Sequence, residues 1–530
     1  MKENAFLLTL LLYLTIIGSV LVFNGTAVIS DPLSHTGKAS STHETLESIS
    51  REIKHDRQID PAGSSVLSLT LQSAIIMALD NNAGFQINRL SPKINTYSEE
   101  MERASFDPTV AASISGQREK VRDGGENLIS GPSSDADSAV AGIRLKEYLP
   151  TGTTIEAGAE GSITAMEDES DSKYRNNNYD VTITQALLRN RGLDANLVGL
   201  RSARIDTEIS VHELQGAAES LIAQVEEVYW DYILAERSIE IYEKSLMIAN
   251  RQVEEVKERI HVGKTAETEL ASAEAEAADR HEQLIVASGI LEVKRLNLIR
   301  LLSPSHGETG WNSRLNLLDS PEIGFLQPDR VEEYVRVALQ KRADIKQARL
   351  QLEQGNLEVI STRNGLLPKL DLFIRLGGSR YANSFSDKGD EDSDDISYSA
   401  GLQFEIPIGN RNAKARHHQQ MLSAEQTKLA LRNMEQLIQI DVRSAYVDMN
   451  RSHERIKAAK KTRLLREKIL AIEVEKFRLG RSTTFLVAQA QRDMISSQIG
   501  EIEAVIDYRK ALLNLHRLEG TLLERRQIQL

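Results

Sequence analysis

Residues 411–479 contain neither glycine nor proline, the two residue types that most often end a helix. Apolar residues recur through this run at helical spacing between charged ones, as at Ile438, Val442 and Ala445. A helix over the whole run would be roughly 100 Å long at about 1.5 Å per residue. Gly480 ends the run, and the helical pattern then resumes to about residue 519. The sequence therefore predicts a very long helical hairpin with coiled-coil packing.

The hairpin belongs to the second copy of a tandem duplication. The segment ALDNNAGFQI from residue 78 resembles ALQKRADIKQ from residue 338, an offset of 260 that also relates Pro108 to Pro368. The segment VEEVYWD at 225–231 resembles VRSAYVD at 442–448, an offset of 217 that also relates Gly263 to Gly480. Because the offset falls by 43, the first copy carries an extra piece between its proline and its long helix.

That part of each copy alternates apolar and polar residues, which predicts half-buried strands. The pattern is regular in ISYSAGLQFEI at 396–406. The extra piece contains two such runs around a PTGT turn and predicts an added hairpin at 139–164. Long acidic connections at one end and a tight turn at the other are typical of outer-membrane barrels. A soluble sandwich with acidic loops would also fit the alternation.

These observations divide the chain into segments. The predicted order is a signal peptide (1–27), a polar extension (28–66), a first repeat (67–303), a linker (304–328), a second repeat (329–523) and a tail (524–530). Within the first repeat we expect a helix at 69–104, strands at 106–190 and a helical hairpin at 194–303. Within the second we expect a helix at 329–365, strands at 368–406 and a helical hairpin at 411–519.

The first residues predict export from the cytoplasm. Lys2 precedes an apolar run at 5–23, and small residues follow at Gly25 and Ala27. A cleaved secretory signal explains this pattern, and an uncleaved membrane anchor is the alternative. The chain has no cysteine, which excludes disulfides and lipid attachment to an N-terminal cysteine.

Composition excludes several functions. The net charge of −13 argues against nucleic acid as a partner. The 11 histidines are scattered, and the adjacent pair His417 and His418 points to different faces of a helix. We therefore expect no catalytic site, metal site or cofactor, and no enzyme activity.

One chain cannot complete the predicted architecture alone. Two helical hairpins are too few to enclose a channel, and four to six strands are too few to close a membrane barrel whose edges must be paired. The sequence therefore predicts oligomerisation, most simply with cyclic symmetry.

From about residue 69 to 523 the chain resembles the TolC family of outer-membrane efflux and secretion channels. The resemblance rests on the duplicated segments at 78–87 and 338–347, the strand entries at 106–108 and 367–368, the segment TQALLRNRG at 184–192, and the two glycine turns. The resemblance implies a homotrimer. Its 12-stranded β-barrel would lie in the lipid of the outer membrane and continue into an α-helical barrel in the periplasm.

The family's partners are a periplasmic adaptor and an inner-membrane pump, so the implied function is a passive exit duct for efflux or type I secretion. A coiled-coil scaffold or surface adhesin without a channel is the alternative function. The extra hairpin departs from the four-strand pattern of the family. Three chains would give 18 strands if the hairpin joins the wall, and 12 if it folds over a rim; we favour 18.

The helix turns are the predicted functional sites. The resemblance implies adaptor docking at Val262, Gly263 and Lys264 and at Leu479, Gly480 and Arg481. Each glycine could equally be a helix cap in the left-handed conformation. The family often carries aspartates after the second turn, where this chain has Leu486 and Gln489. Candidate acidic residues of the pore tip on the other hairpin are Glu267, Glu269 and Glu274.

Overall fold

The computed structural model describes residues 57–59, 65–122, 133–167, 172–263, 266–302, 311–321, 330–383 and 393–530. The signal peptide predicted at 1–27 lies outside these residues. The chain divides into two units, residues 1–59 and residues 60–530. In the first unit only strand β1 (Arg57–Ile59) is described. All that follows concerns residues 60–530.

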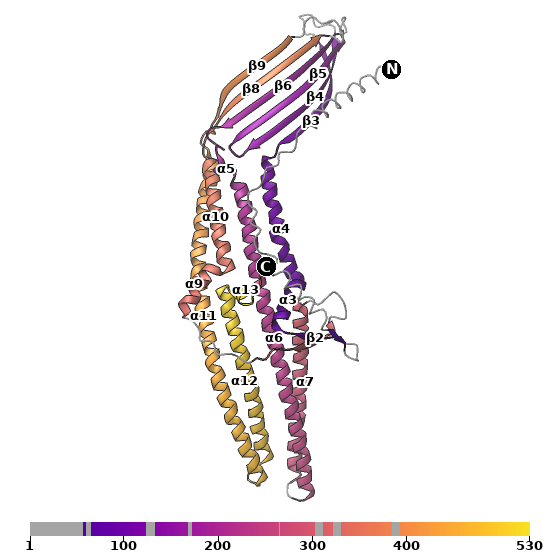
Figure 1. Cartoon of the computed structure of the whole chain (residues 1–530), viewed down its shortest axis with the longest axis vertical. Helices are drawn as coiled ribbons and strands as arrows, with labels where there is room; N and C mark the ends of the chain where they lie inside the picture. The colour runs from indigo at the N-terminus through magenta and orange to yellow at the C-terminus, as the bar shows by residue number, and fades with distance from the viewer. Residues whose placement is uncertain are drawn as a thin grey trace, which may run out of the picture. The chain divides into compact units, whose positions relative to one another are not determined.

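Two long helical hairpins form the helical end of this unit. The first consists of α6 (Val198–His261) and α7 (Thr268–Leu302), and the second of α11 (Arg411–Arg478) and α12 (Thr484–Glu519). A short helix, α5 (Leu193–Asn196), precedes α6. The two hairpins run side by side with their turns at the same end (Figure 1).

The helices that precede the strands differ from the sequence prediction. Each of the single helices predicted at 69–104 and 329–365 is broken in two, giving α3 (Leu71–Asn81) and α4 (Ala83–Arg103), and α9 (Val331–Lys341) and α10 (Ala343–Asn364). The breaks fall at Asn82 and Arg342, which are related by the offset of 260. Asn82 has extended backbone, and its side chain accepts a hydrogen bond of 3.1 Å from the Phe85 amide. This hydrogen bond gives a partner to a backbone amide at the start of α4, which compensates for the helical hydrogen bonds lost at the break.

Six strands form one antiparallel sheet at the other end of the unit (Figure 1). Its order is β3-β4-β5-β6-β8-β9. The strands are β3 (Thr109–Arg122), β4 (Ser133–Leu149), β5 (Thr153–Glu167), β6 (Ser172–Ala186), β8 (Lys369–Asn383) and β9 (Ser393–Glu405). The extra hairpin predicted at 139–164 is β4–β5, and it lies within the sheet between β3 and β6. Strands β3 and β9 form its two edges.

The register gives the sheet one apolar and one polar face. Val110 lies opposite Leu145, Leu145 opposite Ala157, and Ile183 opposite Ile374. Side chains on this apolar face are largely exposed, up to 84% for Tyr398. An exposed apolar sheet face of this extent indicates a surface that is covered by something other than water.

A second pairing of strands joins the start of the first repeat to the segment predicted to be a linker. Strand β2 (Ser65–Leu69) pairs in parallel with β7 (Arg314–Leu317). Thr70 then starts α3 with a capping box shared with Ser73. The predicted linker at 304–328 is therefore partly built into the fold.

The core lies around the middle of α6, where Tyr229, Trp230 and Ile222 are buried. The C-terminal helix α13 (Leu522–Arg525) packs at this level, and the following Arg526 forms an ion pair with Glu226 of α6. Among the described residues, no helix combines the length and the apolar character that a membrane span needs.

Candidate functional site

The turn between α11 and α12 is built by Gly480. The Gly480 amide donates to the carbonyl of Phe477 at 3.0 Å, and the Arg481 amide donates to the carbonyl of Lys476 at 2.8 Å. These two bonds are the Schellman pattern that closes a helix C-terminus, and it requires a left-handed residue at its centre. Gly480 has φ +69°, which matches this requirement.

The serine and threonine residues that follow Gly480 begin the returning helix. Ser482 donates a hydrogen bond from its hydroxyl to Glu473 on α11. This bond, followed by the neighbouring Lys476 ammonium, lowers the pKa of the Glu473 carboxyl. The Thr483 hydroxyl accepts from the Leu486 amide at 3.4 Å and caps α12. The Ser-Thr-Thr cluster thus lets the chain reverse within a few residues.

The turn of the first hairpin ends its helix in the same way. Gly263 has φ +71°, and its amide donates to the carbonyl of Ile260 at 2.9 Å. A Cβ atom at either turn glycine would meet nothing within 4 Å. Both glycines are therefore required by backbone conformation and not by lack of space. Lys264 lies outside the described residues.

The predicted docking residues form two exposed tips. Val262 is 60% and Leu479 71% exposed, and Arg481 is also exposed. Exposed apolar side chains at both turns are compatible with docking of a partner, which remains a prediction. The candidate pore-tip residues lie just beyond the turns: Leu486, Gln489, Glu267 and Glu274 are exposed, and Glu269 is half-buried in the first turn of α7.

Sequence reasoning missed a group of side chains that joins the two hairpins near the tips. Glu276 of α7 pairs with Arg280 on its own helix and, at 2.5 Å, with Arg492 of α12. Glu276 and Arg280 are both buried. The only sequence signal was a Glu and an Arg four residues apart, which is usually a solvated helical pair.

Two further contacts connect the hairpins in this region. The Arg259 guanidinium of α6 lies over the Phe477 ring of α11, 4.7 Å from its centroid. The Gln491 amide of α12 donates to Gln252 of α6 at 3.3 Å. A buried ion pair, a polar contact and a cation–π contact therefore join the two hairpins near the tips.

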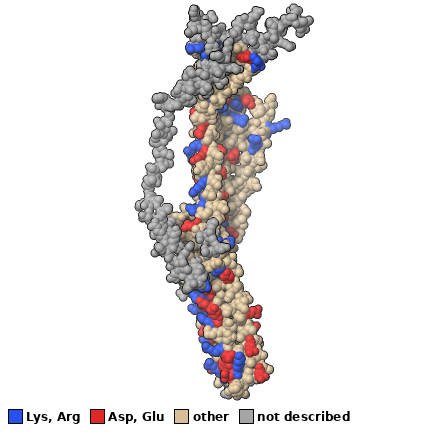
Figure 2. All heavy atoms as spheres, turned by 90° about the vertical axis from the view of Figure 1, so that its right-hand side faces the viewer, with Lys and Arg blue, Asp and Glu red and all other residues tan. Residues whose placement is uncertain are grey.

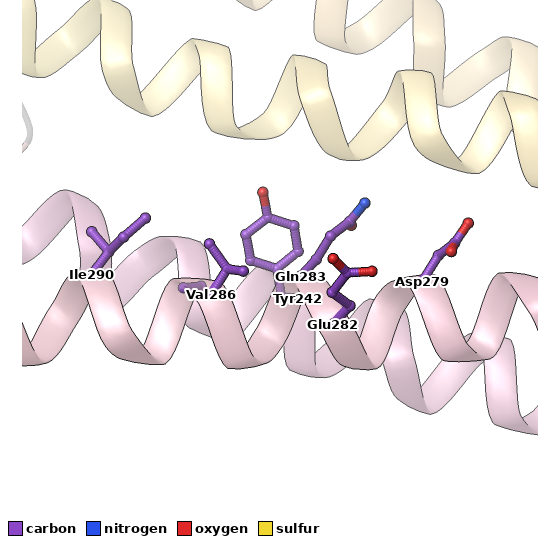
Figure 3. A pocket seen from close by; sticks show the side chains of 7 residues that line it. Tyr242, Asp279, Glu282, Gln283, Val286 and Ile290 are labelled. Carbon is purple, nitrogen blue, oxygen red and sulfur yellow. The ribbon is translucent and has the colours of Figure 1, made fainter.

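A hollow of about 270 Å³ lies along α6 and α7 of the first hairpin (Figure 3). It is lined by Tyr242 of α6 and by Asp279, Glu282, Gln283, Val286, Ala287 and Ile290 of α7. Figure 3 shows Tyr242, Gln283 and Glu282 projecting from these helices on the side where α12 runs. The hollow contains no histidine or cysteine. Within the described residues, no group of three or more metal-ligating side chains is present.

Charge is mixed on the helical surface. On the face shown in Figure 2, Lys and Arg side chains intermingle with Asp and Glu over the helical part near the turns. The long helices carry several ion pairs between residues three or four apart, such as Arg259 with Glu255 at 2.7 Å. Such exposed pairs contribute little to stability but keep a long helix soluble.

Comparison with known proteins identifies the family to which this chain belongs. The model of the outer membrane efflux protein family matches residues 75–303 and 334–521, which are the two repeats. This chain belongs to the outer membrane efflux protein family. The protein is therefore located in the outer membrane with a periplasmic extension, and its family is one of transport proteins.

Individual members of the outer membrane efflux protein family are distant in sequence. The chain is 20% identical over 460 residues to the outer membrane efflux protein BepC of Brucella suis, covering 85% of this chain and 86% of that protein. It is 23% identical over 317 residues to the outer membrane protein TolC of Vibrio cholerae, covering 58% of this chain and 69% of that protein.

Solved structures of the family share the fold. The CmeC outer membrane channel of Campylobacter jejuni superposes with a TM-score of 0.63 at 16% identity, covering 85% of this chain and 86% of that one. The MtrE outer membrane channel of Neisseria gonorrhoeae superposes with a TM-score of 0.58 at 19% identity, covering 86% of this chain and 89% of that one.

Proposed function

We propose that this protein is the protomer of a homotrimeric, passive exit duct that works with a periplasmic adaptor and an inner-membrane pump. It would export small molecules or proteins by efflux or type I secretion, with the energy supplied by the pump. The observation that carries the proposal is the six-stranded sheet with one exposed apolar face and two edges.

The sheet supports a lipid-facing wall. Its apolar face presents exposed Val110, Ile114, Ile374, Leu376, Leu402 and Phe404. Its other face is lined by serine, threonine, asparagine and charged residues, as expected for a surface in contact with water. Because a sheet edge in lipid leaves amide and carbonyl groups unpaired, β3 and β9 would pair with β9 and β3 of neighbouring copies.

The helices offer a matching interface between copies. Exposed apolar residues of α4 form a stripe at spacings of three and four: Ile87, Leu90, Ile94, Tyr97 and Met101. Exposed apolar residues of α11 form a second stripe at one angular position along the helix: Leu422, Leu429, Leu437, Ile440, Val447, Leu465, Ile469 and Ile472. In Figure 1, α4 and α11 lie at opposite sides of the unit. A head-to-tail ring would bury both stripes.

The width of the proposed pore follows from the strand count. The added hairpin β4–β5 pairs with β3 and β6 over most of its length, so all six strands would belong to the wall. Three copies would then give 18 strands. Since barrel diameter grows roughly in proportion to strand number, the pore would be about 1.5 times as wide as a 12-stranded one.

Channel activity is the direct test. Purified protein in planar bilayers is expected to give discrete conductance steps with a single-channel conductance above that of a 12-stranded relative. The absence of channel events, with adaptor present, would overturn the duct and favour a scaffold or adhesin. Channels of 12-strand conductance would leave the duct standing and remove the hairpin from the wall.

The docking role of the tips is tested separately. Gly480→Pro and Gly263→Trp are expected to abolish export while trimers still form, because they alter the exposed turns and leave the α4 and α11 stripes of the proposed interface unchanged. Unchanged export by both variants would contradict docking at these turns.

A further inference from the structure

The polar face of the sheet carries its charges in three neighbouring rows of paired residues. In the first row Lys146 pairs with Glu156, and Arg375 lies further along opposite Thr182. Arg144 and Asp180 belong to the second row, on either side of Gly158, and Glu160 and Asp395 belong to the third. We refer to these seven residues as the charge belt.

A row without charged residues borders the belt on each side. The row nearer the helices contains Tyr148, Thr154, Thr184 and Phe373. The row beyond Glu160 contains Val140, Ser162 and Asn176. The belt is therefore bordered by one neutral row on each side, and on β8 and β9 charge returns beyond the lower neutral row at Asp371 and at the Lys369–Glu405 pair.

The added hairpin supplies four of the seven charges and places the two signs on adjacent strands. The Lys146 ammonium of β4 lies 3.0 Å from the Glu156 carboxylate of β5, and the Arg144 guanidinium lies 3.9 Å from it. The side chains of Arg144 and Lys146 are 56% and 57% exposed, and that of Glu156 is 29% exposed. The two cations therefore share one carboxylate and still reach into the space in front of the sheet.

Gly158 makes the belt continuous across β5. A Cβ atom at this position would lie 2.8 Å from the Asp180 carboxylate oxygen and 3.8 Å from an Arg144 nitrogen. The charged ends of two side chains from flanking strands thus approach each other over the glycine. On the far side, Arg375 of β8 donates to the Thr182 hydroxyl of β6 at 3.1 Å, which orients its guanidinium along the same face.

We propose that the charge belt determines the ion selectivity of the duct and that the β4–β5 hairpin keeps this selectivity weak. The inference rests on the proposed function, in which the polar face lines the pore. Rings of charged side chains select ions by sign. This belt holds three cations and four carboxylates, with opposite signs about one strand spacing of 4.8 Å apart. Such a surface admits cations and anions with similar ease and suits zwitterionic or otherwise dipolar solutes.

Charge removal on one strand tests the belt. In bilayers at about 0.1 M salt, where screening extends over about 10 Å, the parent channel is expected to show a reversal potential near zero in a salt gradient. Arg144→Gln with Lys146→Gln should shift the cation-to-anion permeability ratio upward by about threefold or more. Glu156→Gln with Glu160→Gln should shift it downward by a similar factor.

Chemical modification of a cysteine restores or reverses one charge of the belt within the same channel. Because the chain contains no cysteine, Glu160→Cys carries a single thiol. An anionic thiosulfonate reagent is expected to restore the parent ratio, and a cationic one to increase the preference for anions. The matched controls lie on the apolar face of the same hairpin: Glu147→Gln, and Ala159→Cys treated with either reagent, should leave the ratio unchanged.

The outcomes separate the two proposals. Parent protein that forms no channel contradicts the duct itself. Parent protein that conducts, with a permeability ratio unmoved by both glutamine pairs and by modification of Glu160→Cys, contradicts the charge belt while the duct stands.

Discussion

Trp230 of α6 and Val447 of α11 occupy equivalent positions of the duplication, 217 residues apart, and have opposite environments. Trp230 is 2% exposed, with the Arg509 guanidinium 4.2 Å from its ring centroid. Val447 is 63% exposed. The helices as wholes differ in the same way: 21 residues of α6 are buried and only five of α11.

This difference shows what duplication does to an elongated fold. The two helices are similar in sequence pattern and length, but α6 has neighbours on several sides, among them α4, α7, α10 and α12. Helix α11 lies at the side of the unit with its stripe uncovered. Helix α6 is covered by helices of its own chain. In the proposed trimer, the stripe on α11 would be covered by a neighbouring copy.

The largest expected effect comes from charges placed in the α11 stripe. Leu429→Glu with Ile440→Glu should abolish trimer formation, measured by light scattering in detergent, because unpaired carboxylates would be buried between copies. Helix content should persist, since both side chains are exposed in the single chain. Lys460→Glu, on the opposite side of α11, is the control and should leave the trimer intact. A double variant that still forms trimers would break the comparison.

The next largest effect is expected in the free energy of unfolding, when a buried ion pair and an exposed one at equivalent positions are each disrupted. Glu276→Ala leaves Arg280 buried without its carboxylate partner and is expected to lower the free energy of unfolding by about 3–5 kcal/mol. Its equivalent in the second repeat, Asp493, pairs with Arg466 at 2.6 Å on the surface. Asp493→Ala should cost about 1 kcal/mol or less. Urea unfolding followed by circular dichroism measures both, and equal losses would refute the distinction.

His516 tests a third pair, since its equivalent in the first repeat is Ile299. Burial, and then the charges of Arg525 and Arg526, lower the pKa of the His516 imidazole to about 3. In the unfolded chain the His516 imidazole takes up a proton below its ordinary pKa of about 6.5. In the folded chain the same imidazole stays neutral until the pH approaches 3. Stability is therefore complete above pH 6.5 and is lost as the pH falls from 6.5 toward 3.

Between pH 8 and pH 5 this loss should amount to about 2 kcal/mol at most. Urea unfolding of the parent and of His516→Leu at both pH values measures it. The variant should lose less stability on acidification than the parent does. The same pH dependence in both proteins would exclude His516 as its source.

The smallest effects are expected at the two turns, where the repeats are alike. Gly263→Ala and Gly480→Ala should each cost about 1 kcal/mol, because alanine is strained in the left-handed conformation but meets no atom. Gly520→Ala should cost clearly more, since its Cβ would lie 2.8 Å from the Arg342 amide nitrogen. Unfolding midpoints of the three variants give the comparison.

Several local features could be predicted from the sequence because they depend on short stretches of chain. The turn at Gly480 followed from one glycine after a long run without any, and the left-handed backbone there confirms the helix cap. The added strands followed from alternation over 139–164. Asn82 and Arg342 break the helices before the strands although the helical pattern continues through both, and the capping side chain of Asn82 decides this break. The docking role of the tips stays a prediction.

The sequence by itself determined the duplication, the long hairpins, their turns and the two-faced strands, since each is set by residue spacing along the chain. Only the tertiary structure decided that the β4–β5 hairpin lies inside the sheet, that Glu276 and Arg280 are buried while Asp493 is not, and that seven charges lie in three neighbouring rows of one face. The reason is physical: a pattern shows which face of an element is apolar, but burial and charge pairing depend on what packs against that face.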